Sequence, residues 1–157
     1  MVRNVVAHAP CSVLVVPRDA AMWSRHVLAA VEPGAGDLTA VGLAAAVAAE
    51  CRLPLTITCV ADAESRRAAA EQTLQQALAT ARPFEVRTDT LLLAGRAHER
   101  IVGAARQLNA DLLVLGHHRD EGLSRVWLGD VAQKVIGLAE RPVLVAAPPP
   151  SPNARHP

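Results

Sequence analysis

The chain has little aromatic character. Tyrosine is absent, and one phenylalanine and two tryptophans bring the aromatic fraction of its 157 residues to only 2%. Few side chains are therefore left to build stacking platforms for nucleic-acid bases. The chain also lacks an excess of charge of one sign, because 16 basic and 15 acidic residues leave a formal net charge of +1. A balanced surface has no strong attraction for nucleic acid or an anionic membrane, so we expect neither as a partner.

Cysteine is scarce, and long apolar runs are missing. Cys11, Cys51 and Cys59 form no Cys-x-x-Cys pair, and their odd number and scattered positions favour reduced thiols. No apolar run approaches the roughly 18 residues that a membrane-spanning helix needs. The apolar start of the chain resembles a secretion signal, but a histidine, a proline and an arginine interrupt it before residue 19. These features together predict a cytoplasmic protein.

The sequence motifs of common catalytic sites are also missing. There is no Gly-x-Ser-x-Gly elbow, no Walker loop and no dinucleotide fingerprint after the first expected strand. Ser65 and Ser124 have no recognisable base pattern around them. His117 and His118 are adjacent, so their side chains diverge, and no third ligand has metal-site spacing. We predict no catalytic residue and no metal site, and hence a protein that is not an enzyme.

What the sequence does contain is a regular alternation of short apolar runs with helical patterns. Apolar residues make up 51% of the chain, enough for one full core at this length. The apolar runs are bounded by turn residues and predict strands at 26–31, 55–60, 85–93, 112–115 and 143–146. Helices are expected at 38–53, 64–81 and 97–108, with a last one beginning near Gly129 and stopped by Pro142. Strands that alternate with helices predict an α/β fold with a mainly parallel sheet, covered on both faces.

One stretch carries a family resemblance. Residues 111–146 read as strand, polar loop, helix and strand, and they contain Gly116-x-x-Arg119-x9-Gly129-Asp130, then Val131-Ala132 and Pro142-Val-Leu-Val145. This pattern resembles the C-terminal signature of the universal stress protein family. The ATP-binding branch of that family carries Gly-x2-Gly-x9-Gly-Ser/Thr here. The present chain keeps the first and third glycines, but has Arg119 in place of the second glycine and Asp130 in place of the hydroxyl residue.

The resemblance implies a specific fold and a specific place for a ligand. The fold is doubly wound, with three layers (α/β/α) and a five-stranded, mainly parallel sheet in the order 3-2-1-4-5, like that of adenine nucleotide alpha hydrolases. The first and fourth strands are then neighbours whose helices leave in opposite directions, and ligands bind at such switch points. The loops at 32–36 and 116–129 border this crevice. A helix that begins near Gly129 directs its free N–H groups toward it, as an anion site requires.

The candidate site is a degenerate ATP site, made up of Glu32, Val60, Gly116, Arg119, Gly129 and Asp130. Glu32 stands where ATP-binding relatives carry a ribose-binding aspartate, and it is either a longer substitute or a solvated loop charge. Gly116 and Gly129 either admit a ligand or serve as turn residues. Arg119 can contact a phosphate. Asp130 interacts favourably with the helix dipole and competes with a bound phosphate. ATP is possible as a cofactor, but we expect weak binding or none.

The first 18 residues hold an internal repeat. Laid over residues 131–146 at an offset of 130, they match at Val5/Val135, Ala9/Ala139 and Val13-Leu-Val15/Val143-Leu-Val145. We interpret residues 1–18 as the last helix and strand of a preceding domain of the same family; an ordinary strand with chance similarity is the alternative. Residues 19–25 are then a linker, 26–147 a complete domain and 148–157 a proline-rich disordered tail. Residues 12–16 should lie antiparallel against 143–146, within one chain or by exchange between two.

The resemblance, with its altered loop, predicts a non-enzymatic stress-response module that acts through dimerisation and partner contact. The expected partner is a second copy or another domain of the family, joined through the last strand. The alternative is an ATP-binding switch or slow ATP hydrolase that uses the Gly116/Gly129 loop. A third possibility is a truncated gene product with no function of its own.

Overall fold

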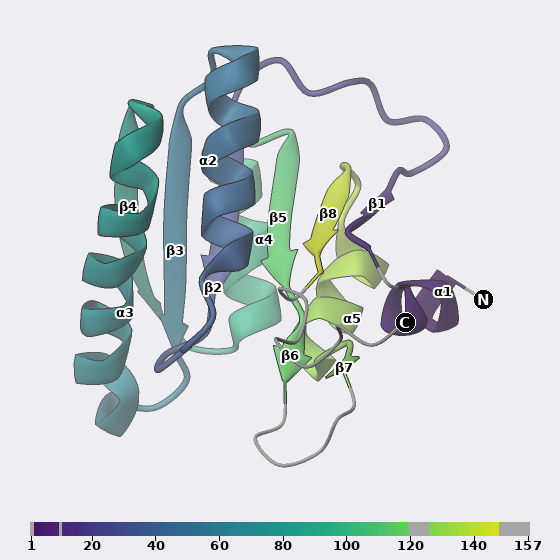
Figure 1. The fold of residues 1–157 in the computed structure, drawn as a ribbon. Coiled ribbons are helices and arrows are strands. Elements are labelled where there is room, and N and C mark those ends of the chain that lie inside the picture. Colours follow the sequence, from purple (N-terminus) through teal and green to yellow (C-terminus); the bar gives the residue numbers. More distant parts are fainter. Residues whose placement is uncertain (1, 10, 120–125, 148–157) are drawn as a thin grey trace, which may run out of the picture.

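The structure, a computed structural model, describes residues 2–9, 11–119 and 126–147 (Figure 1). The proline-rich segment 148–157 lies outside the described residues. The strands are β1 (Val13–Val15), β2 (Val27–Val31), β3 (Leu55–Ala61), β4 (Thr88–Ala94), β5 (Leu112–Gly116), β6 (His118–Arg119), β7 (Val126–Trp127) and β8 (Val143–Ala146). The α-helices are α1 (Val2–His8), α2 (Thr39–Cys51), α3 (Arg67–Ala81), α4 (Ala97–Gln107) and α5 (Asp130–Leu138), and short 3-10 turns occupy Glu64–Arg66 and Arg82–Phe84.

The main sheet has the predicted strand order, with one strand added. Its order is β1-β8-β5-β2-β3-β4, and the five strands β8, β5, β2, β3 and β4 pair in parallel. Numbered within the domain, those five strands follow the order 3-2-1-4-5, so the predicted fold class is confirmed. Each parallel connection crosses over through a helix, as right-handed β-α-β units require.

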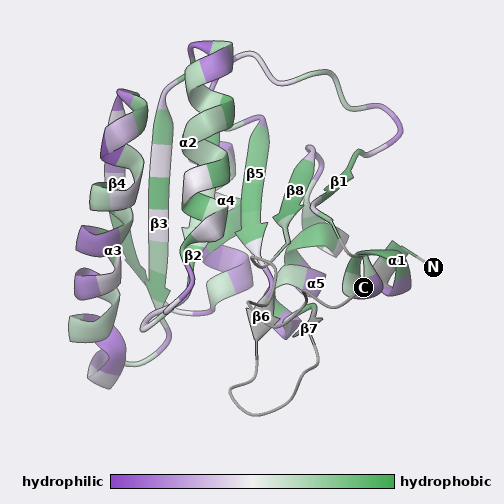
Figure 2. Ribbon diagram, viewed as in Figure 1, coloured by the Kyte–Doolittle hydropathy of each residue, from purple (hydrophilic) through white to green (hydrophobic). Residues whose placement is uncertain are grey.

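Two apolar layers hold the helices on the sheet. Successive residues of a strand point to opposite faces, so Val27 and Ala29 belong to the core under α2 and α3, while Leu28 and Ala30 belong to the core under α4 and α5. Figure 2 shows the strands as largely hydrophobic, with hydrophilic residues concentrated on the helices. The central strands β2 and β3 are buried along almost their entire length, Thr56 and Thr58 of β3 included, as expected for a parallel sheet that is covered on both faces.

Three local predictions were wrong. The strand expected from residue 85 begins at Thr88, because Glu85 adopts a left-handed conformation with φ of 55° after the Arg82–Phe84 turn. The last helix ends at Leu138, where Ala139 is already extended, so Pro142 is not what stops it. The loop expected between Gly116 and Gly129 contains a small antiparallel hairpin, in which His118 pairs with Trp127.

The N-terminal segment pairs with the last strand as predicted. Within one chain, β1 lies antiparallel to β8, with Val13 opposite Val145, Leu14 opposite Leu144 and Val15 opposite Val143. The backbone N–H of Ala147 donates to Ser12 Oγ at 2.9 Å and extends the pairing by one bond. In Figure 1, β1 and α1 lie beside β8 and α5, and a long connection leads from β1 across to β2. The edge of β8 is therefore covered by the chain itself.

A single carboxylate fixes the point where this connection enters the domain. Asp111, directly before β5, accepts hydrogen bonds from the backbone N–H groups of Ser24, Arg25 and His26. Partial burial alone would raise the pKa of Asp111, but these three donors outweigh it and lower the pKa below its ordinary value. The start of β2 is thereby tied to the start of β5.

None of the helices in the described ranges is both long and apolar enough to cross a bilayer.

Candidate functional site

A cleft opens at the carboxyl ends of β2 and β5, which are adjacent in the sheet. Its walls combine the loop after β2 with the end of β5, the start of α5 and the first turns of α4. Lining residues include Glu32, Asp37, Val60, Ile101, Gly116, His117 and Gly129. The helices that follow β2 and β5 cover opposite faces of the sheet, so this is the topological switch point of the fold. Topology and sequence motif select the same location.

Side chains from α3 and from the Glu64–Arg66 turn hold the loop after β2 in place. Gly34 has φ of 79°, a conformation that strains any residue with a Cβ, and its N–H donates to Thr73 Oγ1 at 2.9 Å. The guanidinium of Arg66 donates to the carbonyl of Pro33 at 3.0 Å. Thr73 in turn donates to the carbonyl of Ala69. Nothing in the sequence singles out Arg66 or Thr73, because their contacts join segments more than 30 residues apart.

The loop leads directly into α2 through a carboxylate. Asp37 Oδ1 accepts the backbone N–H of Thr39 at 2.9 Å and also its hydroxyl at 2.5 Å, so it satisfies a donor at the start of the helix. Because Asp37 also lines the cleft, its negative charge faces any ligand there.

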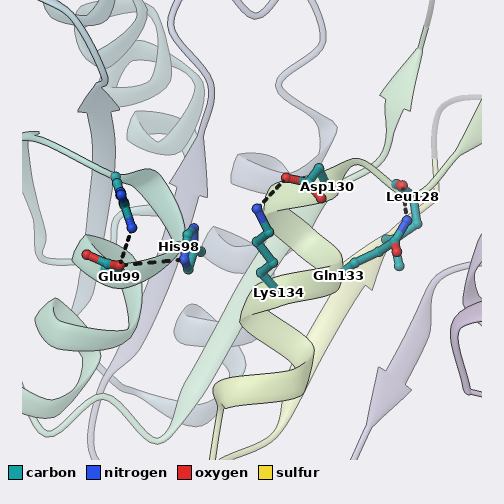
Figure 3. Close-up of polar contacts among 7 residues, drawn as sticks. His98, Glu99, Leu128, Asp130, Gln133 and Lys134 are labelled. Atoms are coloured by element: carbon teal, nitrogen blue, oxygen red, sulfur yellow. Dashed lines mark hydrogen bonds and ion pairs between the residues drawn. The ribbon is translucent and has the colours of Figure 1, made fainter.

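The start of α5 forms the opposite wall. Gly129 is the N-cap, in an extended conformation, and the Asp130 carboxylate lies 2.8 Å from the ammonium of Lys134 one turn on (Figure 3). The Gln133 side chain donates to the carbonyl of Leu128, which fixes the residue before the cap. Figure 3 shows the Asp130–Lys134 pair on the side of α5 that faces α4, where His98 and Glu99 lie. Asp130 is on the rim and not among the residues that line the cleft.

Gly116 is not required by backbone conformation. A Cβ added there would meet the Cβ of Ala40 at 3.7 Å, an ordinary contact, and Gly116 is not among the positive-φ glycines. Gly116 is therefore not needed as a turn residue, which was one of the two interpretations of this position. An alanine would fit at this position but would reduce the space above it, because Gly116 lines the cleft.

The structure thus brings four of the six sequence-derived candidates together. Glu32, Val60, Gly116 and Gly129 line one cleft, and Val60 is 4% exposed. Asp130 borders it. The backbone of Arg119 lies in the β6–β7 hairpin, and its side chain falls outside the described part of the structure.

The cleft is small and acidic. Its volume is about 100 Å³, well below the roughly 300–1,000 Å³ of typical small-molecule sites. Glu32 and Asp37 carry the charges among the described lining residues, and both are negative. Below the loop, burial raises the pKa of the Cys59 thiol to about 11, with Arg66 opposing and Glu32 reinforcing the shift. Among the described lining residues, a phosphate in this cleft would face the carboxylates of Glu32 and Asp37.

His117 connects the cleft to the N-terminal segment. It lines the cleft, its Nδ1 is 2.5 Å from the carbonyl oxygen of Ala146, and its Nε2 is 3.2 Å from the carbonyl oxygen of Val6. Both partners are acceptors, so a neutral ring can donate to one of them and an imidazolium to both. Sequence reasoning considered His117 only as a metal ligand. The described residues contain no group of three or more His, Cys, Asp or Glu side chains placed to hold a metal ion.

These features define a class of protein: a doubly wound α/β domain whose cleft lies where nucleotide-binding folds of this topology take their ligands. The universal stress protein family model matches residues 24–147. The chain belongs to the universal stress protein family.

Curated relatives carry the same name. A universal stress protein of Methanocaldococcus jannaschii is 37% identical over 79 residues, which is 50% of this chain and 46% of the relative. One from Thermus aquaticus is 42% identical over 59 residues, or 38% of this chain and 43% of the relative. The matched part is therefore less than half the length of each of these relatives.

Solved structures agree on the fold. A universal stress protein from Archaeoglobus fulgidus superposes with a TM-score of 0.70 at 21% identity, covering 78% of this chain and 98% of that one. A universal stress protein in complex with cAMP gives a TM-score of 0.65 at 25% identity, covering 79% and 97%. A longer Archaeoglobus fulgidus protein of the family gives 0.69 at 18% identity, covering 93% of this chain but 53% of that one.

Proposed function

We propose that this chain is a non-enzymatic universal stress protein module of the cytoplasm, which acts through contact with another domain of the family and whose nucleotide cleft is degenerate. The lining of the cleft carries the proposal. Glu32 and Asp37 face the cavity, and Asp130 occupies the first turn of the helix whose N-terminus would otherwise receive a phosphate. All three carboxylates are exposed, so solvent screens their repulsion of a phosphate, and together they weaken most the binding of the highly charged triphosphate.

The contact half of the proposal is supported by the last strand. An apolar edge strand such as β8 invites pairing with another chain, and proteins cover such edges. Here the cover is β1, which repeats the sequence of β8. The β8–β1 ladder is thus a pairing between two family-type strands, and we propose that it is the contact through which the module works.

The alternative function is a nucleotide-binding switch or slow ATP hydrolase. It is favoured by the cAMP complex of one similar structure and by the dAMP complex of another, from Archaeoglobus fulgidus, at 21% identity. Both ligands are adenine nucleotides with a single phosphate. A monophosphate places less charge against the cleft than ATP does, so AMP and cAMP are tested beside ATP, the nucleotide that a hydrolase requires.

Calorimetric titration separates the two functions. The 157-residue chain is titrated with ATP and magnesium, and separately with AMP and cAMP. The proposal expects no heat of binding for ATP at micromolar concentrations. The double substitution Arg119→Gly with Asp130→Ser restores the residue types of the ATP-binding branch and should produce measurable ATP binding. Lys134→Ala, which removes an ion-pair partner of Asp130 and leaves the carboxylate in place, should not. A low-micromolar dissociation constant for ATP in the unaltered chain would establish the alternative.

A further inference from the structure

A second crevice opens in the sheet, between the carboxyl ends of β3 and β4, which are adjacent and parallel. The helix after β3 is α3, which packs with α2 in the core on one face of the sheet (Figure 1). The helix after β4 is α4, which packs in the core on the opposite face. Where the connections of two neighbouring strands leave toward opposite faces, a gap is left beyond their carboxyl ends, and ligands of open α/β sheets bind in such gaps. The same divergence opens the cleft between β2 and β5.

A cavity occupies this second crevice, and we call it the β3–β4 cavity. Its volume is about 220 Å³, about twice that of the cleft. Its lining consists of the ends of the two strands and of the segments that directly follow them: Ala61, Asp62, Ala63, Glu64, Arg67, Leu92, Leu93, Ala94 and Gly95. Of the described residues, none lines both the cavity and the cleft. The β3–β4 cavity is therefore a separate site, at the edge strand of the sheet.

Charged side chains of both signs line the β3–β4 cavity. Asp62 and Glu64 contribute carboxylates, and Arg67 contributes a guanidinium. Asp62 lies 3.5 Å from Arg66, and Nε of Arg67 donates to Glu71 at 3.3 Å. Glu64 forms no ion pair with any residue that the structure describes, although Arg67 is only three positions further along the chain. A carboxylate and a guanidinium thus border one cavity without pairing with each other.

This lining complements a molecule that carries both charges. An ammonium group donates to carboxylates, and a guanidinium has five N–H donors in a planar fork that suits a carboxylate. A simple anion in the cavity would meet Asp62 and Glu64, and a simple cation would meet Arg67. The remaining lining side chains are apolar or absent, so they suit a short aliphatic group. The volume is below the roughly 300–1,000 Å³ of sites for drug-sized ligands, which restricts the ligand to a small molecule.

We propose that the β3–β4 cavity is a second ligand site, which takes a free α-amino acid with a small apolar side chain. The ammonium of the ligand lies against Glu64, its carboxylate lies against Arg67, and its side chain lies on the apolar part of the lining. The charged lining residues are exposed, so solvent screens their attraction and the dissociation constant is in the millimolar range. Such an affinity responds to a metabolite that is abundant, and not to one present in traces.

The first test compares three related molecules on the 157-residue chain without nucleotide. L-valine carries both charges, isobutylamine is the same molecule without the carboxylate, and isovalerate is the same molecule without the ammonium. In amide chemical-shift titrations, L-valine should shift the amides of Ala63 and Gly95 along a saturating curve, and leave the Gly116 amide of the cleft unchanged. Each single-charge analogue should bind several-fold more weakly. Equal binding of either analogue, or no saturable shift with millimolar L-valine, would refute the proposal.

The second test changes the lining of the cavity. Glu64→Gln and Arg67→Gln each remove one charge and should weaken L-valine binding several-fold. Glu50→Gln and Arg106→Gln make the same changes at exposed positions outside the cavity and are the matched controls. Ala94→Leu adds bulk at an exposed position of the lining without changing charge, so it should abolish binding and leave the melting temperature unchanged. Binding by the lining variants that matches the controls would show that the shifts arise elsewhere. Because no nucleotide is present, failure here is distinct from failure of the cleft assignment.

Discussion

Val6 is the residue whose replacement best tests how the N-terminal segment is held. Val6 is fully buried, in the core shared with α5 and β8, and its carbonyl oxygen lies 3.2 Å from Nε2 of the His117 ring. Val6→Ala deletes two methyl groups, at about 0.8 kcal/mol each, and leaves a small cavity, so we expect a loss of about 1.5–3 kcal/mol. The higher helix propensity of alanine returns a few tenths of a kcal/mol. The neighbouring Val5→Ala makes the same chemical change at a 59% exposed position and is the matched control.

The loss should appear as local opening of the segment, because a short helix and a three-residue strand attach to an otherwise complete sheet. Native-state hydrogen exchange measures this at the Ala147 amide, whose partner is Ser12 Oγ. Since 1.4 kcal/mol is a tenfold change, Val6→Ala should speed exchange there by about 10- to 100-fold, and Val5→Ala should not. The amide of Leu113, bonded to the carbonyl of Pro142, reports on the main sheet and should change little. Equal effects of the two substitutions, or an Ala147 amide without protection in the unaltered chain, would refute the docking described here.

Three further outcomes are expected. At pH 8, an aromatic disulfide reagent should titrate the two exposed cysteines and spare Cys59, whose pKa is about 11, until the protein is denatured. Asp111→Asn should reduce the loss of stability at acid pH. Because the pKa of Asp111 is lowered in the folded protein, its stabilising effect is complete above about pH 4 and is lost as pH falls through the folded-state pKa. Urea unfolding at several pH values measures the difference. Gly95→Ala should lower the free energy of unfolding by about 1–3 kcal/mol, because φ at Gly95 is 123°. Gly103→Ala lies inside α4 with open space around it and should raise the free energy of unfolding by about 0.5–1 kcal/mol. Thermal unfolding compares the two variants.

Much of the fold could be predicted, because apolar runs and the turn residues between them indicate the strands and helices locally. The apolar runs of β2, β3 and β5 are bounded by turn residues, and the helices between them are continuous polar–apolar segments. The strand order came from the family resemblance, and the pairing of β1 with β8 came from the internal repeat. Each of these signals can be read from the sequence, as a spacing of apolar residues, as a similarity to a family or as an internal repeat.

What could not be predicted depends on contacts between distant residues. Glu85 adopts a left-handed conformation although it is neither glycine nor asparagine, the residues that usually indicate one. The predicted start of β4 therefore lies too early in the chain. The β6–β7 hairpin joins two-residue strands too short to show a period. In the site, Thr73 and Arg66 support a loop that lies 33 to 39 positions earlier in the chain, and their residue types are common on helix surfaces. Such partners become visible only when the fold places them.

His117 is the side chain through which the cleft contacts the N-terminal segment. One imidazole lines the cleft and also lies against carbonyl oxygens of Val6, in the N-terminal segment, and of Ala146, in the last strand. A ligand that turns or reprotonates this ring changes the free energy with which the segment is held. Linkage is reciprocal, so the held segment changes the affinity of that ligand by the same factor. Binding of a ligand that contacts His117 is therefore coupled to the attachment of the chain's own N-terminal segment, even without catalysis.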